Sequence, residues 1–296
     1  MTTGQLNLKQ IFRSADSFFI KTYQSAIFSP DNKYLYFSVK NKVYQLNITT
    51  KEITVAWSGT GKNSFYFYDW SKDGKYLIYI RNHKLVVYDT AEKSKTQIGI
   101  SQARGGIFIN NESAIIYTLT SLYIYNLGFN TSKLLKVFDP MIIYDIITSS
   151  KYIFLKTYDY LFILDFTGTE LLKMKIFTHV PCGIAISADE KYLAVRSDDY
   201  IDGQLENYVI NIIHIATMKI IKQLPTTQDN CKLFFIFDNF LLANITEDNR
   251  LVYLNLNQTK SVIFKDEWYC RSRVSADGTI VALFYPYLRI YQVELN

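Results

Sequence analysis

The most regular feature of the chain is a series of short apolar segments separated by small polar turns. Residues 33–39 and 42–48, for example, each read as one strand, with Lys40 and Asn41 between them. Tyr and Phe, which favour strands over helices, number 24 and 20. The pattern predicts an all-β chain of consecutive antiparallel strands.

A short turn sequence recurs at intervals along the chain. It reads SPDNKYL from Ser29, SKDGKYL from Ser71, SADEKYL from Ser187 and SADGTIV from Ser275. Each copy follows one apolar strand and precedes another, so its Asp, Asn and Gly residues suit a tight turn. Weaker copies bring the number of units to seven, each about 41 residues long, which is the length of a four-stranded propeller blade. We therefore predict a seven-bladed β-propeller that occupies residues 1–296 as a single domain.

The last repeat unit stops before its fourth strand. A segment at about residues 6–13, with apolar side chains at Leu8, Ile11 and Phe12, precedes the first unit and has no place in it. We expect this N-terminal strand to complete the seventh blade, because closure would hide the two edges that an open ring exposes.

The repeat unit resembles a diverged WD repeat, in which a strand, a Ser-x-Asp-Gly turn, a second strand and a strand ending in Trp-Asp recur. The resemblance covers essentially the whole chain. No unit keeps the Trp-Asp pair, and the Gly-His pair of the family is missing. The resemblance therefore implies the blade geometry and not the buried hydrogen-bond network of WD repeats.

Charge and hydropathy restrict the possible partners. The formal net charge of +5 comes from 32 basic and 27 acidic residues scattered along the chain, which disfavours a nucleic-acid-binding face. No apolar run approaches the roughly 20 residues that span a bilayer. Lys9, Arg13 and Asp16 interrupt the amino-terminal segment where a signal peptide would be apolar. These features predict a cytoplasmic protein without a membrane span.

Two segments invite a ligand but lack the spacing that it requires. Residues 59–64 read GTGKNS, which misses the first Gly and the final Ser or Thr of a phosphate loop, so a connection between blades explains them better. The acidic residues within 197–207 miss the ordered spacing of a calcium loop, so we interpret this segment as an extended hairpin.

Three cysteines occupy equivalent positions on the inner strands of three consecutive blades: Cys182, Cys231 and Cys270. Three thiolates around one channel could bind a soft metal. Packing between blades is the favoured interpretation, because a zinc–sulfur bond of about 2.3 Å is too short to join adjacent inner strands. We predict no metal and no cofactor.

The sequence favours a non-catalytic protein over an enzyme. The three histidines come from different strand positions in different blades, and the starts of the inner strands offer a poor acid–base set. The alternative is an enzyme or small-ligand-binding propeller that uses the central channel. The relevant positions are His83, His179 and His214 for the histidines, and Gln24, Tyr66, Arg104, Ile142 and the three cysteines for the strand starts.

One rim of the predicted propeller carries the extended hairpin together with aromatic and arginine residues, which are frequent anchors of protein interfaces. An equally good interpretation of Trp268 and Tyr269 is that they cover the end of the core. We predict a protein-interaction scaffold or adaptor, a subunit of a larger assembly with one or more protein partners. The candidate partner-binding residues are Arg104, His179, Tyr200, Trp268, Tyr269 and Arg271.

Overall fold

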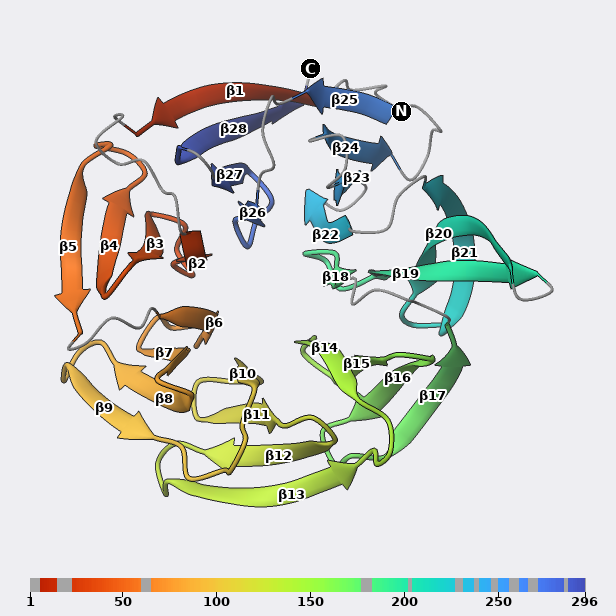
Figure 1. Cartoon of the computed structure of the whole chain (residues 1–296), viewed down its shortest axis with the longest axis horizontal. Helices are drawn as coiled ribbons and strands as arrows, with labels where there is room; N and C mark the ends of the chain where they lie inside the picture. The colour runs from red at the N-terminus through yellow and green to blue at the C-terminus, as the bar shows by residue number, and fades with distance from the viewer. Residues whose placement is uncertain are drawn as a thin grey trace. The chain divides into compact units, whose positions relative to one another are not determined.

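A computed structural model describes residues 6–14, 23–59, 65–176, 183–201, 204–226, 231–236, 240–245, 250–255, 261–265, 271–284 and 287–295. All the regular elements in these ranges are β-strands (Figure 1). They form seven four-stranded sheets, of which six use four strands that are consecutive in the sequence. The fold is a β-propeller with four antiparallel strands per blade.

Four sheets lie between residues 23 and 175, and their strands are β2 (Tyr23–Phe28), β3 (Tyr34–Val39), β4 (Lys42–Asn47) and β5 (Ile53–Ser58); β6 (Tyr66–Trp70), β7 (Tyr76–Arg81), β8 (Lys84–Asp89) and β9 (Ser94–Gln97); β10 (Gly105–Phe108), β11 (Ser113–Tyr117), β12 (Ser121–Asn126) and β13 (Thr131–Val137); and β14 (Ile143–Thr148), β15 (Tyr152–Thr157), β16 (Tyr160–Asp165) and β17 (Glu170–Lys175). The other three sheets are formed by β18 (Ile184–Ile186), β19 (Tyr192–Ile201), β20 (Gln204–His214) and β21 (Lys219–Thr226); β22 (Cys231–Ile236), β23 (Phe240–Ile245), β24 (Arg250–Asn255) and β25 (Ser261–Lys265); and β26 (Arg271–Val274), β27 (Ile280–Phe284), β28 (Arg289–Leu295) and β1 (Leu6–Arg13).

The chain divides into two compact units. One comprises residues 22–157 and 162–173, and the other comprises residues 1–21, 158–161 and 174–296. Within the first unit, consecutive sheets contact one another through the inner strands β2, β6, β10 and β14. Within the second unit, the corresponding contacts join β18 to β22 and β22 to β26. Short inner strands therefore bring neighbouring sheets together in both units.

The recurring Ser-x-Asp turn explains why strands form where the sequence predicts them. In the first copy the Ser29 hydroxyl donates to Asp31 Oδ1 at 2.6 Å and accepts the Tyr34 N–H at 3.0 Å. The same two contacts recur at Ser71, Ser187 and Ser275. The fourth residue of each turn has a positive φ, which Asn and Gly adopt readily. These fourth residues are Asn32, Gly74, Glu190 and Gly278.

The strand predicted at about residues 6–13 fills the fourth place in the last sheet. β1 pairs antiparallel with β28, from Leu6 opposite Leu295 to Arg13 opposite Arg289. Ser14 extends the pairing, because its N–H donates to the Leu288 carbonyl at 2.8 Å. The N-terminal strand is thus held by backbone hydrogen bonds to the last strand of the chain.

Candidate functional site

Of the six candidate partner-binding residues, only the Arg104 side chain lies in the described part of the structure. His179, Trp268 and Tyr269 lie outside the described residues. Tyr200 and Arg271 are placed as backbone positions of β19 and β26. The interface residues predicted around the second unit therefore stay predictions.

Arg104 is exposed immediately before β10, and its backbone N–H donates to the Tyr117 carbonyl at 2.8 Å. Tyr68 and Tyr117 pack beside it with their ring centroids 6.4 Å apart. A Cβ on Gly105 would lie 2.4 Å from the Tyr68 ring and 2.5 Å from the Tyr117 hydroxyl. Gly105 therefore permits the two rings to meet over the strand. Burial raises the pKa of both tyrosines, and the Arg104 charge opposes that rise.

Large apolar side chains are exposed around the loop between β13 and β14. Leu119, Val137 and Ile142 are 40%, 52% and 39% exposed. The backbone of the region is fixed, because the Ile143 N–H donates to the Leu119 carbonyl at 2.7 Å and the Phe138 N–H donates to the Thr120 carbonyl at 2.7 Å. A well-ordered loop thus presents apolar surface to the solvent.

The predicted hairpin at residues 197–207 is confirmed. β19 and β20 stay paired to the tip, where Ile201 lies opposite Gln204. β21 pairs with β20 only as far as Tyr208, so the hairpin continues beyond the four-stranded sheet as a two-stranded ribbon (Figure 1). At its base, the Asn211 amide donates to the Ser197 hydroxyl at 2.7 Å and accepts from Gln223 at 2.9 Å.

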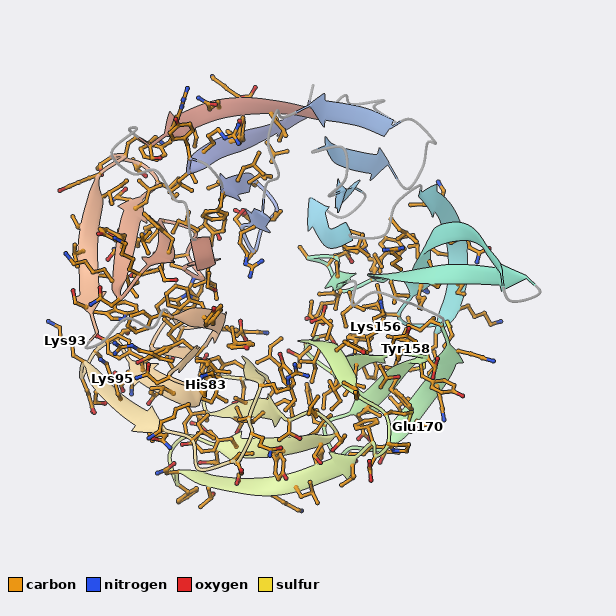
Figure 2. The ribbon with its side chains drawn as sticks, in the orientation of Figure 1. His83, Lys93, Lys95, Lys156, Tyr158 and Glu170 are labelled. Atoms are coloured by element: carbon orange, nitrogen blue, oxygen red, sulfur yellow. The ribbon has the colours of Figure 1, made fainter. Side chains whose placement is uncertain are left out.

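The other sequence candidates are placed only in part. Residues 60–64 of the GTGKNS segment, Cys182 and Cys270 lie outside the described ranges, and Cys231 is placed only as the first backbone position of β22. His83 is an exposed turn residue between β7 and β8 (Figure 2). His214 contacts Thr217 Oγ1 at 3.0 Å through Nδ1. Within the described ranges, no three or more His, Cys, Asp or Glu residues are grouped to hold a metal ion.

Two neighbouring lysines, Lys93 and Lys95, lie on or beside β9 (Figure 2). Every residue of β9 is exposed, so these charges face the solvent at the outer edge of their sheet. Among the described residues, no helix is long and apolar enough to cross a bilayer.

Asp69 is the described carboxyl group with the most perturbed pKa. It lies half-buried on β6, and its Oδ2 accepts the Phe108 N–H of the neighbouring inner strand β10 at 2.7 Å. Burial raises the pKa of Asp69 to about 7, although the N–H groups of Phe108 and Trp70 oppose that rise. The carboxyl thus joins two sheets and titrates near neutral pH.

A pocket lies between the sheets β2–β5 and β6–β9, at the end of the strands where the Ser-x-Asp turns are found. It encloses about 280 Å³. Its walls are aromatic, and its mouth is formed by two Ser-x-Asp turns and the turn after β8. The lining residues are Ser29, Pro30, Asp31, Tyr34, Tyr36, Trp70, Lys72, Asp73, Gly74 and Thr90.

The aromatic residues of the pocket wall pack against one another and against a third ring. The ring centroids of Tyr36 and Trp70 lie 5.2 Å apart, and those of Tyr36 and Trp57 lie 5.8 Å apart. At the mouth, the Thr90 hydroxyl donates to the carbonyls of Gly74 and Lys75. The Trp70 indole N–H is buried and has no hydrogen-bond partner in the described part of the chain. The pocket is therefore a preformed aromatic slot with an unpaired donor in one of its wall residues.

Sequence reasoning missed this pocket because it looked for function at the opposite strand ends. One signal was available, since Trp70 stands where the other clear turn copies have Phe28, Ile186 and Val274. A single tryptophan in a position otherwise filled by smaller residues indicates a local change in packing.

Comparison with solved structures supports the fold. A chain in the mitotic checkpoint complex superposes with a TM-score of 0.77 at 13% identity, covering 97% of this chain and 93% of that one. The β-propeller domain of Myceliophteria thermophila Cps50 (Swd1) gives 0.70 at 12% identity, covering 97% and 100%. Kuenenia stuttgartiensis hydrazine synthase gives 0.72 at 14% identity, covering 96% and 98%. No model of a protein family and no curated protein matches the chain, so the WD-repeat resemblance rests on the repeat pattern and on the fold.

Proposed function

We propose that this β-propeller is a non-catalytic protein-interaction scaffold, a cytoplasmic subunit of a larger assembly whose seven sheets close into one ring. The observation that carries the proposal is the exposed apolar surface at Leu119, Val137 and Ile142 on a hydrogen-bonded loop. Exposed apolar groups on an ordered surface are typical of protein-binding sites. Membership of one similar chain in the mitotic checkpoint complex agrees with such a role.

The rim predicted from the sequence belongs to the same proposal. Arg104 precedes β10 and Ile142 precedes β14, so both lie at starts of inner strands, as does the exposed Tyr66 at the start of β6. Aromatic and arginine side chains frequently dominate the binding energy of an interface. We expect His179, Tyr200, Trp268, Tyr269 and Arg271 to contact a partner as well.

Partner capture from the source cells tests the surface. The variant Leu119→Asp with Ile142→Asp should lose its partner, with affinity falling by about thirtyfold or more, as for an interface hot spot. The matched control is Val55→Asp with Leu134→Asp, because both side chains are 50% exposed on the outer strands β5 and β13. Loss of the partner in the control alone would assign the interface to the outer strands. Tyr200→Ala with Arg271→Ala tests the remaining rim in the same assay.

Deletion of residues 1–14 tests whether β1 closes the ring. This deletion leaves β28 with an unpaired edge, and exposed edges promote aggregation. We expect a large fall in melting temperature or a loss of the monomer in gel filtration. A truncated protein that is as stable as the parent would contradict closure through β1.

A second candidate, catalysis or small-ligand binding, is favoured by one observation. The pKa of Asp69, raised to about 7, suits proton transfer near neutral pH. Its carboxyl already accepts the Phe108 N–H, which is a sufficient reason for its position. Native mass spectrometry of the purified parent and of Asp69→Asn tests this candidate, which predicts a co-purified small molecule that the variant loses.

A further inference from the structure

We propose that the pocket between the sheets β2–β5 and β6–β9 binds an arginine side chain of a partner protein. This inference rests on the scaffold function and adds a partner chemistry to it. With about 280 Å³, the pocket is smaller than sites that enclose a whole drug-sized ligand, and it suits one inserted side chain.

The aromatic walls provide the first reason for choosing arginine. Tyr34, Tyr36 and Trp70 line the slot, and the Tyr36 and Trp70 rings are tilted by 50° at a centroid distance of 5.2 Å. A guanidinium group stacks on such ring faces and is attracted by their negative electrostatic potential. The alkyl stem of an arginine would meanwhile cover apolar surface.

The carboxylates at the mouth provide the second reason. Asp31 and Asp73 are ionised at neutral pH, since hydrogen bonds from Ser29 and Ser71 are the largest cause lowering the pKa of each. Asp73 Oδ1 accepts from the Ser71 hydroxyl and the Lys75 N–H, so it is already occupied. The other oxygen, Oδ2, is left to receive a ligand.

The Asp73 turn differs from two of its copies in this respect. Lys33 lies 3.5 Å from Asp31 Oδ2, and Lys191 lies 2.6 Å from Asp189 Oδ2. In the Asp73 turn the corresponding lysine, Lys75, lies 3.8 Å from Asp89 and 4.9 Å from the Tyr76 ring centroid instead. Within the described part of the chain, no side chain pairs with Asp73 Oδ2. Of the three turns that carry a lysine at this place, the turn at the pocket is the one whose lysine pairs with another carboxylate.

Trp70 adds an unpaired polar group to the pocket wall. Its side chain is nine-tenths buried, yet the indole N–H has no partner among the described residues. A buried unpaired donor costs about 1–3 kcal/mol, so this wall residue is not fully satisfied in the free protein.

Lys72 gives the proposal a directional test. Its exposed ammonium group lies at the pocket and would repel a bound guanidinium. We expect Lys72→Ala to tighten binding of an arginine about two- to threefold, in line with exposed charge pairs. An anionic ligand would respond in the opposite direction.

The experiment uses N-acetyl-arginine amide as the probe and the tryptophan indole N–H signals of the full chain as the readout. The chain has three tryptophans, and Trp70→Phe assigns the Trp70 signal. We expect the probe to shift this signal with saturation, and the uncharged citrulline analogue to leave it unchanged. Asp73→Asn, which retains the Oδ1 acceptor, should weaken binding about tenfold. Asp189→Asn, the same change in an equivalent turn, should have no effect.

The proposal is overturned if the Trp70 signal does not respond, if citrulline binds equally well, or if Asp73→Asn binds like the parent. Capture of the partner by the parent, Asp73→Asn and Asp189→Asn distinguishes failure of the pocket from failure of the scaffold. A partner held equally by all three proteins, with no response to the probe, removes the pocket and keeps the scaffold. A parent protein without any partner removes the scaffold, while the probe still decides what the pocket binds.

Discussion

The sheet β6–β9 packs against its two neighbours in different ways. Toward β2–β5 the contact is made mainly by rings, including Tyr36, Trp57 and Trp70. Toward β10–β13 it is made mainly by aliphatic side chains such as Ile78 and Ile116. Tyr36 and Ile78 are both the third residue of the second strand in their sheets, so the same place in the repeat serves both contacts.

At the Ser-x-Asp turns, a hydrogen bond joins neighbouring sheets on one side of β6–β9 and is absent at the facing proline on the other. On the aliphatic side, the Asp73 N–H donates to Asn111 Oδ1 at 3.2 Å and joins the turns of neighbouring sheets. On the aromatic side, the facing residue is Pro30, which has no N–H to donate and lies about 3.8 Å from the Cβ position of Gly74. Large rings hold the sheets together behind the turns and leave the pocket between them. A change in residue size at equivalent places in a repeat can thus leave a pocket between two sheets.

The largest expected losses of stability come from truncating the last side chain of β6, which is Trp70, and of β10, which is Phe108. Phe108→Ala and Trp70→Ala should each lower the free energy of unfolding by about 3–5 kcal/mol. We expect the greater loss at Phe108, because water can enter the space left beside the pocket at Trp70 but not the closed aliphatic contact. Urea denaturation measures both values. A greater loss of unfolding free energy at Trp70 would show that water entering beside the pocket does not reduce the cost of the cavity.

A change on the short strand β10 should have the next largest effect. Gly105→Ala places a Cβ 2.4 Å from the Tyr68 ring and 2.5 Å from the Tyr117 hydroxyl, so one ring must move. Overpacking of this kind costs about 1–3 kcal/mol. Thermal unfolding measures the loss, and Gly99→Ala is the control, since no atom lies within 4 Å of the Cβ position there.

The Asp69 carboxyl should make the contact between β6 and β10 sensitive to pH. Its pKa is raised from 3.8 to about 7 in the folded protein, so folding favours the protonated form. The stabilising contribution is complete below pH 4 and is lost as the pH rises through 7. Asp69→Asn retains an oxygen for the Phe108 N–H and should gain up to about 4 kcal/mol relative to the parent between pH 4 and pH 8, at about 1.4 kcal/mol per pKa unit. An unchanged difference between parent and variant across this range would contradict the raised pKa.

The smallest expected effect concerns the hydrogen bond between turns. Asn111→Ala removes the acceptor for the Asp73 N–H at an exposed site, which should cost about 0.5–1 kcal/mol. The variant should also loosen the Lys72–Gly74 turn and thereby weaken probe binding in the pocket. Hydrogen exchange of the Asp73 amide provides the measurement, and slow exchange in the variant would show that Asn111 is not needed.

The strands and turns could be predicted from the sequence because their causes are local. Ser29 and Asp31 close their turn through contacts two to five residues apart, and the alternation in residues 33–39 assigns one side of β3 to each neighbour. The pairing of β1 with β28 was also predictable, since one strand was missing and one was left over.

The pocket could not be predicted in the same way. It depends on how Tyr36 and Trp70, from different sheets, tilt against each other, and on Lys75 lying toward Asp89 instead of Asp73. No spacing in the sequence specifies those side-chain directions. Composition indicated an interaction surface but favoured the other end of the strands, where Arg104 lies.

The pairing of β1 with β28 has a consequence for synthesis on the ribosome. The Leu288 N–H donates to Ser14 Oγ across 274 residues of chain. At about 5–20 residues per second, roughly 14–55 seconds pass between the synthesis of β1 and the synthesis of its partner strand. During that interval the strand is an unpaired edge that invites association with other chains. We therefore expect the nascent protein to depend on chaperone binding near residues 6–14 until β28 has been synthesised.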